Sequence, residues 1–168
     1  MTPPPLLAEA LDAWGDVREG LVEEVSLFAE EELDFRPADG SRSVRELIWH
    51  VVETARMWCG ELPREDGDFT RQGFPAFVEE YGGDAREART REELIDLLRR
   101  SLSEGARALE AAGDARMLEP IRRFDGERWS RISWMHHGIA HEMYHRGQVA
   151  LYHRLLGRTP ALTRQIGG

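Results

Sequence analysis

Apolar residues recur at intervals of three and four positions along four stretches of the chain, and this spacing is typical of amphipathic helices. The first stretch has its apolar positions at Leu7, Leu11, Trp14, Val17, Leu21, Val25 and Phe28. The second stretch ends at Pro63, and its apolar positions are Val44, Leu47, Ile48, Val51, Ala55, Trp58 and Leu62. The pattern therefore predicts two long helices, each with one face directed toward a core.

Capping sequences mark where two of the predicted helices begin. In Ser43-Val44-Arg45-Glu46, the first and last side chains can each accept a hydrogen bond from the other residue's free backbone N–H group. Thr90-Arg91-Glu92-Glu93 repeats this arrangement and opens a third helix, which Gly113 is expected to end. The apolar stripe of this third helix consists of Leu94, Leu98, Leu102, Leu109 and Ala112.

A fourth helix is predicted from Ser130 or Ser133 to Leu156, followed by Gly157. Just before it, Asp125-Gly126 lies between two short runs and is a hairpin signal. A small two-stranded ribbon and a plain loop both fit this stretch.

Residues 63–89 are rich in glycine and charge, and they are too many for a tight turn between the second and third helices. We expect a crossover there, with a short helix at 75–81, held to the body by Phe69, Phe74, Phe77 and Tyr81. Four long helices with one long crossover predict an all-α four-helix bundle. A chain of 168 residues and 19.2 kDa fits a single domain over residues 1–168.

The chain carries a net charge of −9, and all 22 of its basic residues are arginine. Acidic residues alternate with most of these arginines, which argues against nucleic acid as a partner. The absence of lysine also excludes chemistry that needs a Schiff-base or P-loop lysine.

No apolar run is long enough to cross a bilayer, and the N-terminus lacks the features of a signal peptide. Cys59 is the only cysteine, so the chain cannot form an internal disulfide. We therefore expect a cytoplasmic protein without a membrane partner, with Cys59 buried as a small apolar residue.

Histidines carry the clearest chemical signal. His141 and His145 are four positions apart on the predicted fourth helix, so they lie about 40° apart around its axis and can converge on one cation. A zinc-type site usually takes three protein ligands, and His50, midway along the second helix, is predicted to face the interior. The same residues also fit a plain bundle in which the spacing is incidental.

Residues 137–148 contain the pattern H-x3-H-E-x2-H-R-G-Q, followed by ALYHRLLG. This segment resembles the C-terminal helix of the DinB-like superfamily, which includes YfiT-type metal-dependent hydrolases and thiol S-transferases and is unrelated to the translesion polymerase of similar name. SVRELIWHVVETARMW resembles the second helix of that family, whose mid-helix histidine is the first metal ligand. The resemblance spans nearly the whole chain in helix order and loop placement.

The resemblance implies an up-down-down-up bundle that is commonly dimeric and binds a divalent metal ion through three histidines. Carried over to this chain, the ligands are His50, His141 and His145, and zinc or nickel is the expected metal. His137 is expected to line the site or to substitute as a ligand. Neither a catalytic residue nor an organic cofactor follows from the resemblance.

Other residues of the motif are expected to have structural roles. Glu142 is rotated about 100° from His141 around the helix, so it should not be a ligand. Arg146 is expected to pair with a carboxylate across the bundle, and Gly147 to permit close helix approach. Gln148 has no predicted chemical role.

Several side chains elsewhere have two interpretations. Glu53, one turn after the expected ligand of the second helix, could orient that ligand or act as a base, but a surface charge is the favoured interpretation. His136 and His153 are expected to be solvated or to pack. Trp134 and Tyr144 are candidates for lining a pocket, although core or dimer contacts are the default for them.

Such a site is compatible with more than one function. A metal ion held by three neutral histidines, with an open position, can acidify water or bind a thiol as thiolate. We therefore expect a homodimeric metal-dependent enzyme acting on a small molecule, with a thiol S-transferase using a low-molecular-weight thiol slightly ahead of a hydrolase. The alternatives are a metal-binding stress-response or structural bundle without turnover, and a helical module without a metal.

Overall fold

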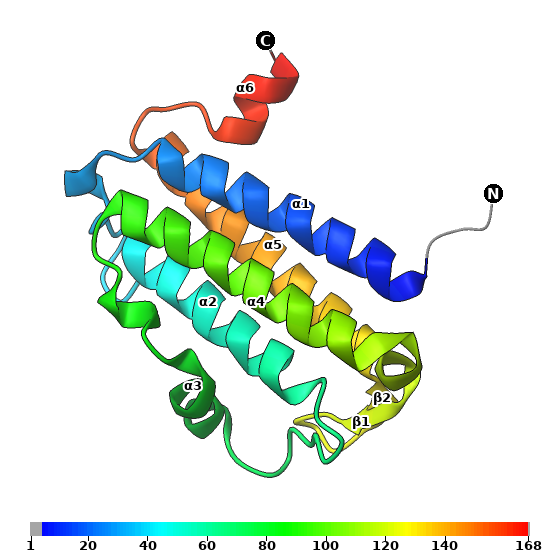
Figure 1. Cartoon of the computed structure of the whole chain (residues 1–168). Helices are drawn as coiled ribbons and strands as arrows, with labels where there is room; N and C mark the ends of the chain where they lie inside the picture. The colour runs from blue at the N-terminus through cyan, green and yellow to red at the C-terminus, as the bar shows by residue number, and fades with distance from the viewer. Residues whose placement is uncertain (1–4, 168) are drawn as a thin grey trace.

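Four long helices form the body of the computed structural model, which describes residues 5–167. They are α1 (Leu6–Ser26), α2 (Val44–Glu61), α4 (Arg91–Leu118) and α5 (Arg131–Leu155). α1 and α5 run in one direction, while α2 and α4 run in the other (Figure 1). The predicted four-helix bundle with up-down-down-up topology is therefore confirmed.

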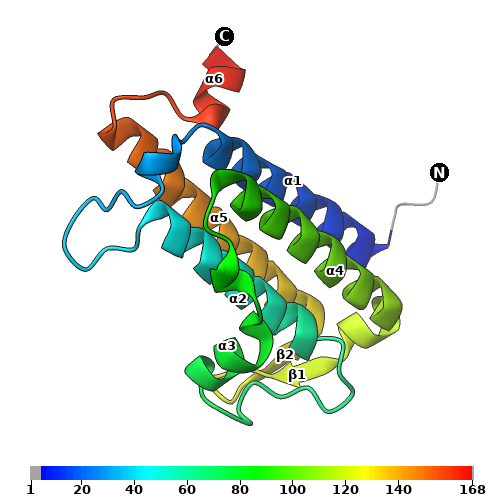
Figure 2. The ribbon, with the colours of Figure 1, turned by 60° about the vertical axis from the view of Figure 1, so that its left-hand side comes forward.

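The core lies where α1 and α2 each pack against both α4 and α5, an arrangement that a second view also shows (Figure 2). The stripes predicted for α1 and α2 are buried there, apart from the half-buried Leu11. One end of the core contains Leu21, Val25, Phe28, Leu47, Val51, Leu98 and Val149. The other end contains Leu7, Trp14, Trp58, Leu109 and Met135.

Short elements connect the long helices or follow them. They are η1 (Glu30–Glu32), α3 (Phe74–Gly82), η2 (Ala85–Glu87), β1 (Pro120–Arg122), β2 (Arg128–Ser130) and α6 (Ala161–Gly167). β1 and β2 pair antiparallel with Ile121 opposite Trp129, and Gly126 has a φ of 85° in their turn, so the ribbon is present rather than a plain loop. α6 has no counterpart among the predicted helices, because its 7 residues are too few for a clear periodic pattern.

Both predicted capping boxes form. Glu46 N donates to Ser43 Oγ (3.3 Å), and Ser43 N donates to Glu46 Oε2 (2.9 Å). Thr90 and Glu93 make the same reciprocal pair of hydrogen bonds. At Gly113 the backbone leaves the helical region with a φ of 75°, as a helix-ending glycine would, but α4 resumes beyond it.

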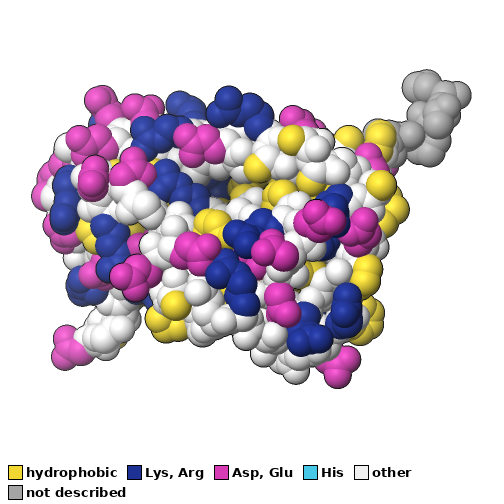
Figure 3. Space-filling model, turned by 60° about the horizontal axis from the view of Figure 1, so that its bottom comes forward, with side chains coloured by type: hydrophobic (Ala, Val, Ile, Leu, Met, Phe, Trp, Pro, Cys, Tyr) yellow, Lys and Arg dark blue, Asp and Glu magenta, His cyan; other side chains and the backbone are white. Residues whose placement is uncertain are grey.

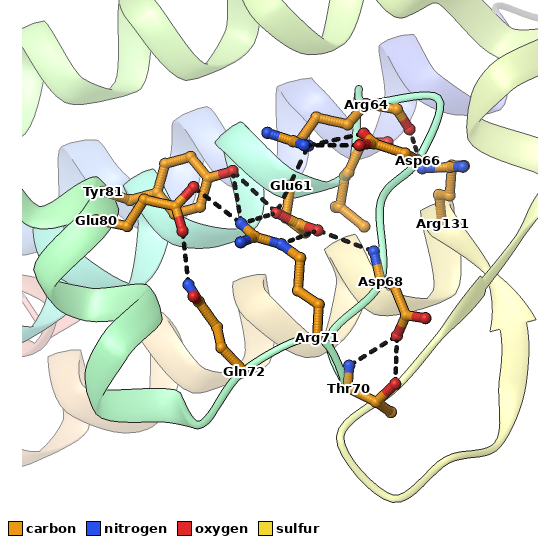
Figure 4. Close-up of polar contacts among 11 residues, drawn as sticks. Glu61, Arg64, Asp66, Asp68, Thr70, Arg71, Gln72, Glu80, Tyr81 and Arg131 are labelled. Carbon is orange, nitrogen blue, oxygen red and sulfur yellow. Dashed lines mark hydrogen bonds and ion pairs between the residues drawn. The ribbon is translucent and has the colours of Figure 1, made fainter.

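The crossover between α2 and α4 is anchored by Glu61, the last residue of α2, whose side chain is fully buried. Its carboxylate accepts hydrogen bonds from Asp68 N (2.8 Å), Arg71 Nη2 (2.8 Å) and the Tyr81 hydroxyl (2.9 Å) (Figure 4). A buried carboxylate with this many donors is satisfied without water. The loop and α3 are therefore held against the end of α2.

Aromatic side chains hold the same segment against the body of the bundle. Phe69 and Phe77 are fully buried, and the rings of Phe77 and Tyr81 are stacked. Of the four predicted aromatic tethers, Phe69, Phe77 and Tyr81 pack against the core, whereas Phe74 is 41% exposed.

Charges of both signs are interspersed on the face of the molecule shown in Figure 3, in line with their alternation in the sequence. None of the helices described within residues 5–167 is long and apolar enough to serve as a membrane span. Cys59 is buried among apolar neighbours, as predicted.

One buried ion pair crosses the core between α1 and α5. The fully buried Arg18 donates from both Nε and Nη2 to the carboxylate of Glu142, with Nη2 at 2.8 Å. Trp14 Nε1 donates to the same carboxylate (2.9 Å), and Arg18 Nη1 donates to Leu98 O and Ser101 Oγ, each at 2.6 Å. Because each charge has several partners, the pair is tolerated in a core that excludes water.

Replacing Glu142 with alanine should lower the free energy of unfolding by about 3–5 kcal/mol, because Arg18 would stay charged in the core without its partner. Replacing both residues, Arg18→Met with Glu142→Leu, should recover most of that loss. Urea denaturation followed by circular dichroism measures both effects. An unchanged unfolding midpoint for Glu142→Ala would contradict the buried pairing.

Candidate metal centre

Three histidine side chains from two helices meet between α2 and α5. His50 Nε2 lies 3.2 Å from His141 Nε2, and His141 Nε2 lies 3.0 Å from His145 Nε2. One ring nitrogen from each residue lies within 4.8 Å of the other two. The structure therefore brings together the three residues that the sequence singled out.

The rotation of α5 about its axis directs both of its histidines toward α2. Glu142 points to α1, where Arg18 and Trp14 hold its carboxylate. His141 is one residue earlier, about 100° away around the helix, and His145 follows one turn later on the same side. Glu142 is thus engaged in the core rather than with the histidines, as the spacing predicts.

Gln148 fixes the orientation of one ring. His145 Nδ1 donates to Gln148 Oε1 (2.7 Å), so the proton lies on Nδ1 and the Nε2 lone pair faces the other two histidines. A neighbouring acceptor often orients a metal-binding imidazole in this way. This role was not predicted, although a spacing of three residues places both side chains on one helix face.

All three rings favour the neutral form that coordinates metals. Burial, helped by the charge of Arg42 and by the other two histidines, lowers the pKa of His50 to about 3. Burial likewise lowers the pKa of His141 to about 4 and lowers the pKa of His145. At neutral pH each ring therefore has an uncharged nitrogen lone pair available to a cation.

Two cavities open beside the histidine cluster. The larger, about 750 Å³, has His50 in its wall, and the smaller, about 180 Å³, has His141 in its wall. Phe74 borders both cavities. Trp134 lines the smaller one, whereas Tyr144 is 65% exposed and lines neither of them.

The remaining histidines lie outside the cluster. His137 is exposed, stacks on Trp134 with ring centroids 4.6 Å apart, and lines the smaller cavity. It therefore borders the site. His136 is exposed, whereas His153 is fully buried and its Nε2 donates to Glu24 O (2.9 Å), which gives it a packing role.

The favoured interpretation of Glu53 as a surface charge is wrong. Its side chain is buried because the guanidinium of Arg86, in η2, pairs with its carboxylate. The sequence pattern does not indicate this pairing, because the two partners are 33 residues apart and are brought together by the crossover.

Two predictions for the HRGQ segment are also wrong. The Arg146 guanidinium lies over Gly20 of α1, and none of the ion pairs within residues 5–167 involves it. A Cβ at Gly147 would meet no atom within 4 Å, so this glycine does not permit close approach. Gly138 does so instead, because a Cβ there would lie 2.6 Å from Trp58 Nε1.

The chain thus belongs to the class of helical bundles that carry a histidine cluster between two facing helices. Its bundle has up-down-down-up topology, and the three histidines of the cluster are neutral. The sequence matches the model of the DinB superfamily over residues 4–149, which is most of the chain. The protein therefore belongs to the DinB superfamily. A comparison with curated proteins finds no match.

Solved structures that share this fold include YfiT, a DinB-like protein and a maleylpyruvate isomerase. YfiT from Bacillus subtilis, a probable metal-dependent hydrolase with an unusual four-helix bundle topology, is 15% identical with a TM-score of 0.70, over 94% of this chain and 95% of its own. A DinB-like protein from Bacillus cereus is 19% identical with a TM-score of 0.67, over 90% of this chain and 93% of its own. The mycothiol-dependent maleylpyruvate isomerase is 16% identical with a TM-score of 0.67, over 89% of this chain and 63% of its own. At these identities the likeness shows the fold alone.

Proposed function

We propose that His50, His141 and His145 bind one divalent metal ion and that the protein is a metal-dependent enzyme acting on a small molecule. The observation that carries this proposal is the convergence of three Nε2 atoms from two helices. Gln148 supports it by directing the His145 lone pair toward the other rings. Zinc or nickel is the proposed metal, because imidazole nitrogen suits both.

A divalent ion with three neutral histidines keeps its charge and an open position, and so supplies the chemistry to acidify water or to bind a thiol as thiolate. The chain's own residues supply the rest of the site. α2 and α5 fix the rings, and the cavities beside His50 and His141 leave room for a substrate. This access favours a catalytic role over a structural one, because structural zinc sites usually have four protein ligands.

Of the two reaction types, we propose thiol S-transfer slightly ahead of hydrolysis. Glu53 is paired with Arg86 and Glu142 with Arg18, so neither carboxylate is free to act as a general base toward water. A thiol loses its proton far more readily than water and depends less on such a base. Among the fold relatives, the maleylpyruvate isomerase depends on the thiol mycothiol and YfiT is a probable metal-dependent hydrolase, so both a thiol-dependent reaction and a probable hydrolysis are found on this fold.

The metal content of the purified protein tests the site. Prepared without a histidine tag, the wild type should retain about one divalent ion per chain, measured by plasma mass spectrometry. His50→Ala, His141→Ala and His145→Ala should each lose most of it, because each removes one of three donors. Gln148→Ala should weaken metal affinity roughly 10–100-fold.

His136→Ala is the matched control for these variants, since this histidine is exposed and lies outside the cluster. It should keep the wild-type metal content. Equally little metal in the wild type and in the triple alanine variant would contradict the metal site.

A thiol-conjugation assay tests the reaction type. With a low-molecular-weight bacterial thiol and monochlorobimane, the metal-loaded wild type should form the fluorescent conjugate faster than the uncatalysed background, and His141→Ala should not. Background rates with every thiol tried, together with metal-dependent ester cleavage, would favour the hydrolase. Metal binding without either activity would favour the alternative, a metal-binding stress-response or structural bundle without turnover.

We also infer that residues 1–168 form one domain and that two chains associate as a homodimer in the cytoplasm. Tyr144, Leu151 and Leu155 support the association, because they are exposed and share the face of α5 opposite Glu142.

Light scattering should give about twice the 19.2 kDa chain mass, and the double variant Leu151→Arg/Leu155→Arg should be monomeric. A monomeric wild type would rule out this arrangement.

A further inference from the structure

The two cavities adjoin each other at the histidine cluster. His50 belongs to the wall of the larger cavity and His141 to the wall of the smaller, and their Nε2 atoms are 3.2 Å apart. Phe74 contributes to both walls. A molecule bound at the cluster would therefore have the larger cavity on one side of the ring nitrogens and the smaller cavity on the other.

The smaller cavity is suited to a compact apolar group. Its wall includes Met57, Trp58, Phe124 and Trp134 in addition to Phe74. At about 180 Å³ it is comparable to an apolar cavity of about 150 Å³ that accepts benzene. It therefore has room for roughly one six-membered ring.

The larger cavity has a different chemistry, set by its arginines. Arg36 is engaged by Glu46, and Arg86 is engaged by Glu53, so the charges of these two arginines are matched within the wall. Arg42 has no ion pair within residues 5–167, and its side chain is exposed. At about 750 Å³ the cavity lies in the usual range for small-molecule sites.

Arg42 and His50 belong to the same side of this wall. Arg42 immediately precedes Ser43, the N-cap of α2, and His50 lies on α2 itself. Glu79, the other charged wall residue without an ion pair within residues 5–167, lies on α3. The unmatched positive charge and the nearest histidine of the cluster are therefore both carried by α2 and the residue that precedes its N-cap.

The backbone of Arg42 is held in place independently of its side chain. Its carbonyl accepts a hydrogen bond from the Tyr152 hydroxyl (2.9 Å), and the next residue is Ser43, the N-cap of α2. The backbone position from which the Arg42 side chain extends is therefore fixed at the start of α2. A planar guanidinium with no carboxylate partner is well suited to binding a carboxylate or phosphate group through two parallel hydrogen bonds.

We propose that the substrate of this site is an anionic small molecule with two parts: an anionic group that Arg42 binds in the larger cavity, and an apolar group of about one ring that fills the smaller cavity. The inference rests on the proposed function, because it assigns the substrate of the same histidine cluster. The reacting bond would lie between the two parts, next to the ring nitrogens. Arg42 is then a specificity residue and Trp134 a wall of the apolar subsite.

Calorimetric titration with two matched probes tests the proposal in the metal-free, full-length protein. The probes are 3-phenylpropionate and its neutral analogue 3-phenylpropanamide, which differ in charge but share the ring. The wild type should bind the acid at least about tenfold more tightly than the amide, because an ion pair with hydrogen bonds is lost with the amide. Arg42→Gln should reduce this preference to within about threefold.

Two further variants separate the subsites. Trp134→Ala should weaken the binding of both probes by a similar factor, because it removes part of the wall around their phenyl ring and leaves Arg42 in place. Arg107→Gln, which changes an exposed arginine of α4 that lies in neither cavity wall, should bind both probes like the wild type. The thermal unfolding midpoint of each variant shows that its fold is retained.

Three results would overturn the proposal: equal binding of acid and amide by the wild type, an unchanged preference in Arg42→Gln, or no binding of either probe at about 10 mM. Metal content measured on the same preparations keeps this test separate from that of the proposed function. If the protein prefers the acid but never binds metal, only the proposed metal site is contradicted. If it binds metal but does not prefer the acid, only the substrate assignment is contradicted.

Discussion

The buried pairing of Glu142 with Arg18 is the constraint on which the rest of the site depends. Two opposite charges in a dry core are tolerated only when each keeps several hydrogen bonds, and here Trp14, Leu98 and Ser101 complete the set. Rotating α5 about its axis would break the hydrogen bonds that Arg18 and Trp14 donate to Glu142. The pair therefore sets the face of α5 that meets α1, and with it the face that presents histidines to α2.

The second constraint is the crossover, which determines what surrounds the histidines. Glu61 holds the loop after α2 through three hydrogen-bonding partners, and this places α3 and η2 along α2. Phe74 and Arg86 then reach the walls of the larger cavity. The helices fix the histidines, while the crossover supplies one part of the wall of the larger cavity and the loop before α2 supplies another.

Membership of the DinB superfamily accounts for the bundle, while the particular chemistry of this chain lies in residues around the cluster. Gln148 sets the tautomer of His145, and Arg42 adds an unmatched positive charge to the wall of the larger cavity. His137 and Trp134 stack on each other at the apolar cavity. The charge of Arg42 and the stacked rings of Trp134 and His137 therefore give the two cavities chemically different walls.

The sequence by itself determined the four long helices, their capping boxes, the ribbon signal at Asp125-Gly126 and the spacing of His141 and His145. These features depend on periodicity and on spacings of a few residues, which a local stretch of the chain is enough to show. Only the tertiary structure decided the burial of Glu53 against Arg86, the position of Arg146 over Gly20, and the close approach at Gly138 rather than Gly147. Each of these depends on which helix faces which, and that relation is set by contacts between residues far apart in the chain.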